Sequence, residues 1–501
     1  MGGSNKSFGL PDLRRLSARG GFYTAAAQAG SYALQLVATA FLARILLPED
    51  FGVVMMVTAS VSLLGYVAVD FGLTDATIQK KELEASDLSG LFWTSVCAGT
   101  LVAVLSIAAA PFLAWFYGDS RVTMITVAIA PSFLLQGMAV QHRALLSREM
   151  RFGAVSLIQV FSVLAGVAVA LVAAVAGAGY WSLVMQPSAM NLAAMVAAWS
   201  FHRWRPGMLG FGSGLRWFLR FGRDLTLFNL LSRFSRMIDR IVVGKTCGAA
   251  DLGYYTRASA LLLIPLGQII LPMGKVVVPV LSRLQDDAPR LRRYFARIAN
   301  IVGLTTFLPI AILAALAEEV VLVLLGPNWL PSVEIFRILS LAVLARVLHG
   351  MITWVSTALG RSRQLRRWSL ISLPTILICV LAGSRFGMTG VAVSYSIASF
   401  LTLSPGLHLL VKFTPVTGGD IVRSMWRPLL LGILLYGVVS AARMWLSDLD
   451  AWLCGLAAAV LGTALTAPVV LFWKEARREV AEVLLLVREA GGREASSGPA
   501  A

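Results

Sequence analysis

Fourteen long apolar segments follow one another along this chain, and its positive charge alternates with them. Of the 43 Lys and Arg residues, 31 lie in or at the edges of every second gap, or at the two ends of the chain. Basic residues collect on the cytoplasmic side of membrane helices. The pattern therefore predicts a polytopic membrane protein with both termini in the cytoplasm. Only five cations fall in the other gaps, namely Arg44, Arg121, Lys245, Arg385 and Arg443.

The composition restricts the classes of function and partner that the protein can have. Only 14% of the 501 residues are charged, where a soluble chain carries about 25%. The net charge of +17 could indicate nucleic acid, but the cations lie in short loops between apolar helices. Anionic lipid of the inner leaflet is the better partner for such loops, and we expect no nucleic acid. With no Cys-x-x-Cys and no phosphate loop, we also expect no metal, no cofactor and no ATPase.

The apolar segments predict transmembrane helices. Each span needs about 20 apolar residues, and unpaired backbone cannot face lipid. We therefore expect an all-α fold of about 14 transmembrane helices, and the first apolar stretch, too long for a cleavable signal, stays as span one. The predicted spans are 22–46, 52–74, 89–115, 122–142, 154–176, 180–201, 224–246, 254–278, 295–317, 333–357, 365–383, 388–411, 425–445 and 450–473.

An internal repeat is visible in the sequence. Arg44, Asp50 and Gly52 recur as Lys245, Asp251 and Gly253, at an offset of 201 residues. Further on, Arg148 recurs as Arg361, and the run Ser156-Leu157-Ile158 recurs as Ser369-Leu370-Ile371, both at an offset of 213. The matches predict two six-span halves. An even number of spans makes them parallel repeats, whose substrate site lies at the repeat interface near the membrane midplane.

The repeat leads to a domain scheme. Arg216, Arg220 and Arg223 lie at helical spacing beside Trp217 and Phe218, which is typical of an amphipathic helix at the headgroup layer. A mixed charged and apolar segment after the last span predicts a second surface helix. The predicted domains are an N-lobe of spans 1–6 (1–210), an interfacial helix (211–223), a C-lobe of spans 7–12 (224–412), spans 13–14 (413–473), and a cytoplasmic amphipathic helix with a disordered tail (474–501).

Several stretches resemble a known family. Together they are similar to the Wzx-type branch of the multidrug/oligosaccharidyl-lipid/polysaccharide exporter superfamily, and within it to exopolysaccharide exporters of the colanic-acid type. The similarity covers spans 1–12 well and the tail poorly. The stretches are Leu47–Gly52, Asp70–Leu73, Leu146–Phe152, Gly179–Val184, and Asp239–Ala258 followed by Pro265, Pro272, Pro279 and Ser282.

The resemblance implies a function. Members of this branch are V-shaped, two-lobed carriers that flip undecaprenyl-pyrophosphate-linked oligosaccharide to the periplasmic leaflet, for exopolysaccharide or lipopolysaccharide biosynthesis. By this resemblance we expect a protein of the bacterial inner membrane that is not an enzyme. Its partners would be the lipid-linked oligosaccharide and membrane lipids, with a polysaccharide polymerase and the export machinery as further candidates.

Charges inside the predicted spans indicate a binding site. Arg233, Arg236 and Arg240 share one face of span seven, and Asp239 is placed to pair with Arg236. Each Arg costs about 2.5–3.5 kcal/mol at a bilayer centre, so the three should face a wet or protein-lined interior. Guanidinium groups match pyrophosphate oxygens in a bidentate manner. The alternatives are structural ion pairs between the lobes, or snorkelling from near the span ends.

Other charges complete the candidate set. Arg44 and Lys245 occupy equivalent repeat positions at periplasmic ends, where they could bind the glycan or anchor at headgroups. Arg257 lies one predicted turn into span eight. Asp70 and Asp239 are candidates for a charge partner or for coupling to an ion gradient. The full set of substrate-binding candidates is Arg44, Arg233, Arg236, Arg240, Lys245 and Arg257; Lys275 and Arg346 also lie in spans, without an assigned role.

Two other function classes remain open. A cation- or proton-coupled drug antiporter of the same superfamily would need acidic residues in its cavity, whereas the charge inside these spans is mostly basic. A membrane glycosyl transferase or polymerase would need long external loops. The pair Asp448 and Asp450 has the spacing of a metal-binding motif, but its loop is too short to hold a nucleotide.

The topology can be tested with reporter fusions. We expect fusions after Phe116, Ala178 and Asp448 to report a periplasmic location, and fusions after Arg205 and Arg363 a cytoplasmic one, because charge alternation sets the orientation. Paired phosphatase and fluorescent-protein fusions would measure this. A cytoplasmic signal at Asp448 would remove the last two spans from the scheme.

Overall fold

The computed structural model describes residues 10–70, 77, 85–207, 234–235, 237–446 and 450–472. Every regular element in these residues is a helix. Each predicted span overlaps a described helix, although span seven does so only at its end. Seven helical stretches in this part of the chain are long and apolar enough, by length and composition, to cross a membrane. The all-α prediction is confirmed for the described residues.

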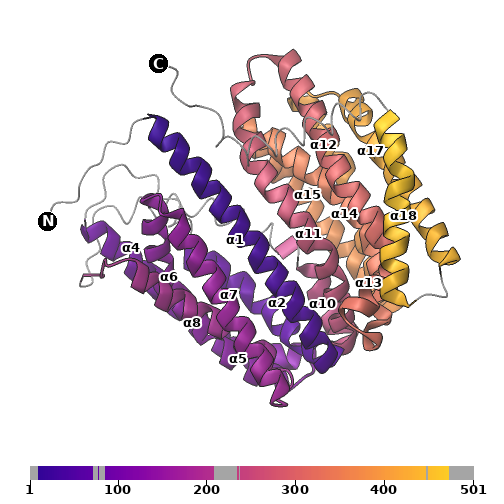
Figure 1. Cartoon of the computed structure of the whole chain (residues 1–501). Helices are drawn as coiled ribbons and strands as arrows, with labels where there is room; N and C mark the ends of the chain where they lie inside the picture. The colour runs from indigo at the N-terminus through magenta and orange to yellow at the C-terminus, as the bar shows by residue number, and fades with distance from the viewer. Residues whose placement is uncertain are drawn as a thin grey trace, which may run out of the picture. The chain divides into compact units, whose positions relative to one another are not determined.

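The chain divides into two compact units, and each is described by itself. Unit 1 combines Met1–Leu46 with Met56–Leu230. Within it α7 packs along both α1 and α8, and α6 packs against α4 and α8 (Figure 1). Its described helices are α1 (Leu10–Ile45), most of α2 (Pro48–Asp70), α4 (Ala85–Tyr117), α5 (Arg121–Ile129), α6 (Pro131–Arg148), α7 (Phe152–Val175) and α8 (Trp181–Phe201).

Unit 2 combines Leu47–Met55 with Leu231–Ala501, so it includes the start of α2. In this unit α14 packs against α11 and α16, and α17 packs along α12 and α18. Its elements are α10 (Ile238–Thr246), α11 (Gly248–Arg283), α12 (Ala288–Ala315), α13 (Ala317–Leu324), η1 (Pro327–Trp329), α14 (Pro331–Ala358), α15 (Ser362–Gly383), η2 (Ser384–Phe386), α16 (Gly387–Phe413), α17 (Gly418–Trp445) and α18 (Ala451–Phe472).

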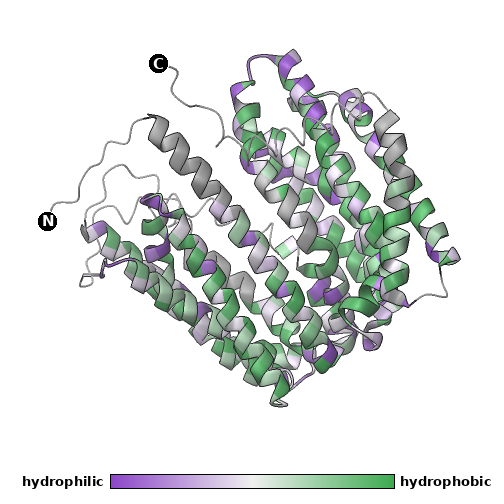
Figure 2. Cartoon of the chain, viewed as in Figure 1, coloured by the Kyte–Doolittle hydropathy of each residue, from purple (hydrophilic) through white to green (hydrophobic). Residues whose placement is uncertain are grey.

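Hydropathy follows the helices in the way that a membrane requires. Figure 2 shows mostly hydrophobic colour along the middle of the helices, whereas the turn that joins α11 to α12 is hydrophilic. Large apolar side chains remain exposed on the outer faces, among them Trp115, Val172 and Ile433. A soluble protein rarely exposes such extended apolar surface. Lipid tails are the solvent that suits these faces.

Helix boundaries differ from the prediction where polar residues are helical. Helix α1 begins at Leu10 rather than at residue 22, and α11 begins at Gly248 rather than at residue 254. Gly248 adopts φ = 89°, so the chain reverses there without a loop. Arg257 consequently lies more than two turns into α11, and the prediction of one turn was wrong. Helix α13, in the predicted loop after span nine, was not predicted.

The structure refines the register of the internal repeat. Helix α1 ends at Ile45 and α10 ends at Thr246, which keeps the offset of 201. In the second match the structural offset is 210, not 213. The amide of Arg151 donates to the Leu146 carbonyl, as that of Arg361 does to Ser356, in the same left-handed turn after a helix. Arg361 therefore corresponds to Arg151, and its pairing with Arg148 was wrong.

The starts of α2 and α11 cross at two glycines within unit 2. A Cβ atom on Gly52 would lie 1.7 Å from the carbonyl oxygen of Ala249, and one on Gly253 would lie 1.9 Å from that of Pro48. At the repeat offset of 201, Gly52 corresponds to Gly253 and Pro48 to Ala249. Gly52 therefore contacts Ala249, and its repeat equivalent Gly253 contacts Pro48, the repeat equivalent of Ala249. The two contacts are thus equivalent under the repeat offset.

Ion pairs fix α17 to α12 at both ends. Near the two helix starts, the Arg292 guanidinium donates to both carboxylate oxygens of Asp420, at 2.7 and 3.1 Å. Near the end of α17, Arg443 donates to Glu318 and Glu319, which lie in the first turn of α13, the helix that follows α12. The two helices therefore run parallel. Spans nine and thirteen are both odd-numbered, so parallel packing agrees with the predicted topology.

The glycine crossing predicts a position-dependent alanine effect. We expect Gly52→Ala and Gly253→Ala each to lower the free energy of unfolding by about 1–3 kcal/mol, because the added Cβ meets backbone that cannot rotate away. Gly267→Ala, also in α11 but with open space around it, is the matched control and should be neutral or slightly stabilising. Thermal unfolding of the purified variants measures this. Equal melting temperatures for all three would contradict the close crossing.

Candidate binding site in unit 2

The site is built at the corner between α10 and α11. The sharp turn at Gly248 folds these helices against each other. This brings Asp239 of α10 beside Tyr255 of α11, and the phenol hydroxyl donates to Asp239 Oδ2 at 2.8 Å. Both side chains are buried. A buried carboxylate costs free energy unless it is hydrogen-bonded or paired, and the tyrosine supplies one of the bonds that Asp239 needs.

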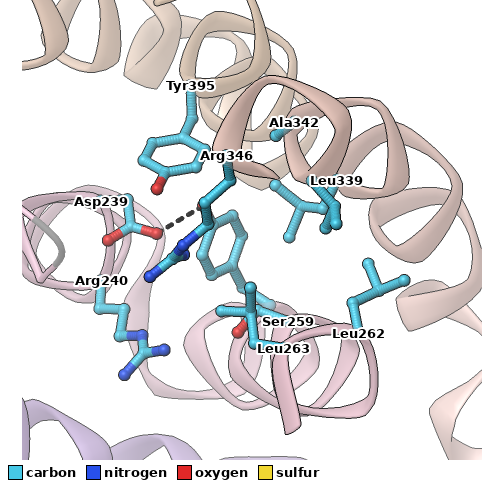
Figure 3. A pocket seen from close by; sticks show the side chains of 11 residues that line it. Asp239, Arg240, Ser259, Leu262, Leu263, Leu339, Ala342, Arg346 and Tyr395 are labelled. Carbon is cyan, nitrogen blue, oxygen red and sulfur yellow. Dashed lines mark hydrogen bonds between the residues drawn. The ribbon is translucent and has the colours of Figure 1, made fainter. Parts of the chain in front are cut away.

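A small cavity, lined by both charged and apolar residues, opens beside this pair. Its volume of about 30 Å³ has room for ordered water. Figure 3 shows Arg346 reaching from α14 into the space next to Asp239, while Arg240 extends to another side. The lining residues come from α10, α11, α14 and α16: Asp239, Arg240, Tyr255, Ser259, Leu262, Leu263, Leu339, Ala342, Val343, Arg346 and Tyr395.

The cavity carries more positive than negative charge. One carboxylate, Asp239, faces two guanidinium groups, those of Arg240 and Arg346. Among the described residues, Asp239 Oδ1 and Arg240 Nε are buried with no hydrogen-bond partner. Buried groups of this kind are normally satisfied by water, an ion or a ligand. The arrangement can therefore bind an anion at the arginines, or take up a proton or a cation at Asp239.

Arg257 lies in different surroundings. Its guanidinium packs over the ring of Phe51 at 4.8 Å from the centroid, and its Nε has no hydrogen-bond partner among the described residues. Phe51 in turn packs edge-on against the fully buried Trp329, with the ring centroids 5.3 Å apart. Cation–π contact partly compensates the desolvated charge. Arg257 is therefore linked to the first turn of α2 rather than to the cavity lining.

The remaining predicted site residues are more dispersed. Arg44 is exposed in the last turn of α1, in unit 1, and Lys245 is exposed in the last turn of α10. A cation in this position is stabilised by the helix macrodipole. Asp70 is the last residue of α2. Its side chain lies outside the described residues, and so do Arg233 and Arg236, including the predicted pairing of Arg236 with Asp239.

Sequence reasoning assigned no role to three residues of the cavity. Tyr255 and Tyr395 gave no signal, because tyrosines in apolar helices are common packing residues. Arg346 was recognised in the sequence as a cation within a predicted span, but nothing in the sequence placed it near Asp239. Contact between α10, α11, α14 and α16 is a tertiary property, and no local pattern predicts it.

Comparison with known proteins identifies the family. Residues 41–334 match the model of the family described as Polysaccharide biosynthesis protein. The chain belongs to this family. Among curated proteins, the chain is similar to the teichuronic acid biosynthesis protein TuaB of Bacillus subtilis, with 24% identity over 75% of this chain and 80% of TuaB. The lipopolysaccharide biosynthesis protein WzxC of Escherichia coli is 24% identical over 84% of this chain and 86% of WzxC.

Solved structures show the same fold for this family member. The lipid II flippase MurJ in an inward closed conformation superposes with a TM-score of 0.69, at 14% identity, over 89% of this chain and 98% of MurJ. An inward-facing multidrug resistance MATE family transporter of the MOP superfamily reaches 0.61, at 13% identity, over 79% and 94%. The protein is thus a multi-pass membrane protein with a MOP-type transporter fold. The predicted resemblance is confirmed, and so is the prediction that the protein is not an enzyme.

The charge balance of the cavity predicts an asymmetry between two variants. Asp239→Ala should lower the free energy of unfolding by about 3–5 kcal/mol, because it removes the buried carboxylate that lies beside the two half-buried arginines of the cavity. Tyr255→Phe removes a single hydrogen bond and should cost about 1–3 kcal/mol. Thermal unfolding in detergent compares the two. A larger loss for Tyr255→Phe than for Asp239→Ala would show that Asp239 compensates no buried charge.

Proposed function

We propose that this protein flips undecaprenyl-pyrophosphate-linked oligosaccharide across the bacterial inner membrane for exopolysaccharide or lipopolysaccharide biosynthesis. The observation that carries the proposal is the net positive, buried cavity on α10 and α11, in helices that the membrane requires to be apolar. The relatives support the substrate class, since their names place them in teichuronic acid, lipopolysaccharide and succinoglycan biosynthesis. The fold that the chain shares with a lipid II flippase supports the reaction.

The pyrophosphate is the part of the substrate that the membrane repels most. Three arginines share one face at the sequence position of span seven, namely Arg233, Arg236 and Arg240. In our proposal these groups, assisted by Arg257, bind the pyrophosphate through bidentate hydrogen bonds while the head crosses the membrane. Arg236 is the deepest of the three in the predicted span, so it carries the largest share. Arg44 and Lys245 would contact the glycan at the periplasmic side.

The movement in the proposal is alternating access around a central cationic cavity. The head would enter from the cytoplasm and leave toward the periplasm, while the polyprenyl tail stays in lipid near spans 13 and 14. The crossing of Gly52 and Gly253 lies at helix starts that the predicted topology places on the periplasmic side. We propose that this crossing is part of the closed periplasmic end. Separating it would also uncover Arg257, since Phe51 belongs to the same turn.

The energy source must lie outside a nucleotide site, because the sequence contains no phosphate loop. An ion gradient, the membrane potential or consumption of the product would drive transport. Asp239 is the stronger coupling candidate: it is buried and lines the cavity. Asp70 is the second candidate. Both termini lie in the cytoplasm in this scheme, and a polymerase and the export machinery would take up the flipped product.

A proton- or cation-coupled antiporter of the same superfamily is the second candidate function. The observation that favours it is the same buried Asp239, because antiporters need a titratable acid in the cavity. Its two neighbouring arginines favour an anionic substrate instead. Transport of a cationic dye by the purified protein in vesicles, abolished by Asp239→Asn, would support the antiporter over the flippase.

Arg236 provides the direct test of the flippase. We expect Arg236→Ala to abolish polysaccharide export at normal protein level, with lipid-linked oligosaccharide accumulating in the inner leaflet. Arg236→Lys should restore export only in part, because an ammonium keeps the charge but loses the bidentate geometry. Arg233→Ala and Arg240→Ala should have milder effects, because both lie nearer an end of the predicted span than Arg236 does. Export and the amount of lipid-linked oligosaccharide are both measured in cells.

The control for this series is Arg385→Ala, which removes an exposed cation from η2 on the predicted periplasmic side. It should leave export unchanged. Export at the wild-type rate by Arg236→Ala would remove the anion site from span seven, and the cations of spans one and eight would then be the remaining candidates.

A further inference from the structure

A long apolar groove lies on unit 2 between α12, α14 and α17. Its volume is about 470 Å³. The floor is made of buried residues of α12, among them Phe307, Ala311 and Ala314. The rims are exposed and apolar, and Leu341 and Ile433 are respectively 55% and 65% accessible. The groove therefore opens toward the surroundings of the protein, where the surrounding medium is lipid.

The groove persists because α17 cannot close it. The Arg292–Asp420 pair at one end and the Arg443–Glu318/Glu319 cluster at the other hold α17 against α12. Small residues, Ala311 and Ala314 on the floor and Gly432 on α17, leave the space between α17 and α14 unfilled by protein. Because this space opens to the bilayer, an apolar chain of a membrane lipid can fill it.

Positive charge marks one end of the groove. Arg337 is in the second turn of α14 and lines the groove, with its side chain 43% accessible. The nearest acid is Glu318, at 3.8 Å, but Glu318 already accepts a much closer hydrogen bond from Arg443. Arg337 thus keeps hydrogen-bonding capacity for an anion. Guanidinium groups bind phosphate oxygens through charge-assisted hydrogen bonds.

The length of the groove selects the kind of lipid. From Arg337 it follows α14 inward to Leu344, seven residues further along, which is about 10 Å of helix. One leaflet of the hydrocarbon core is about 15 Å thick. The groove therefore matches one acyl chain of a single leaflet, with the phosphate at its outer end. An undecaprenyl chain is much longer and would need a groove that continues past the midplane.

We propose that this groove binds a resident glycerophospholipid of the periplasmic leaflet. Its phosphate contacts Arg337 and one acyl chain lies between α14 and α17. The lipid fills the space that the two ion-pair clusters keep open, and so stabilises the packing of α17 on unit 2. The site is separate from the cavity at Asp239, and the proposal holds whether or not the protein is a flippase.

Native mass spectrometry of the protein extracted in mild detergent tests the proposal. We expect one tightly held phospholipid on the wild-type protein. Gly432→Leu, which places a side chain in the groove, should lose it. Arg337→Gln should weaken binding of dioleoylphosphatidylglycerol to the delipidated protein about tenfold, the effect of losing one charge-assisted contact. That lipid should also raise the melting temperature of the wild-type protein more than that of Arg337→Gln.

Two matched controls isolate the groove. Gly437→Leu adds the same side chain to an open position on α17 outside the groove, and Arg385→Gln removes an exposed cation elsewhere. Both should bind lipid as the wild type does. Equal lipid loss in Gly432→Leu and Gly437→Leu would overturn the site, as would a polyprenyl pyrophosphate as the released mass. If Gly432→Leu does not fold, the titrations of Arg337→Gln and Arg385→Gln decide: equal affinities would overturn the proposal.

Discussion

A lipid bilayer offers no hydrogen-bond partners, and the rest of this structure depends on that constraint. It makes every described element a helix and moves ion pairs toward helix ends, as with Arg292–Asp420 and Arg443–Glu318/Glu319. Charges that remain inside must find partners within the protein. Asp239 finds one in Tyr255, whereas parts of Arg240 and Arg257 find none among the described residues. These exceptions identify the residues that we assign to function.

The two glycines at the starts of α2 and α11 connect the repeat to the mechanism. A helix backbone approaches another this closely only at a residue that carries no Cβ atom. The two contacts are equivalent under the repeat offset of 201. In our proposal they form part of the closed periplasmic end. Phe51 lies in the same turn and packs on Arg257, so the proposed opening would also change the surroundings of this cation.

Two hollows in unit 2 differ in the solvent that they suit. The cavity at Asp239 is small and lined by one carboxylate and two guanidinium groups, and it suits water, an anion or a proton. The groove at Ile433 is larger, open and apolar, with its charge at one end. Lipid must be excluded from the cavity, whereas the groove must contact it. The carrier that we propose would use both kinds of surface.

The sequence by itself determined the class of the protein. Hydropathy and charge alternation predicted the helices and the membrane fold, because spans of about 20 apolar residues and cytoplasmic cations are local properties. It also named Asp239, Arg240 and Arg257. Tertiary structure decided that Asp239 binds Tyr255, that Arg346 joins them, and that Arg257 packs on Phe51. These depend on how helices distant in sequence approach one another, and side-chain packing sets that approach.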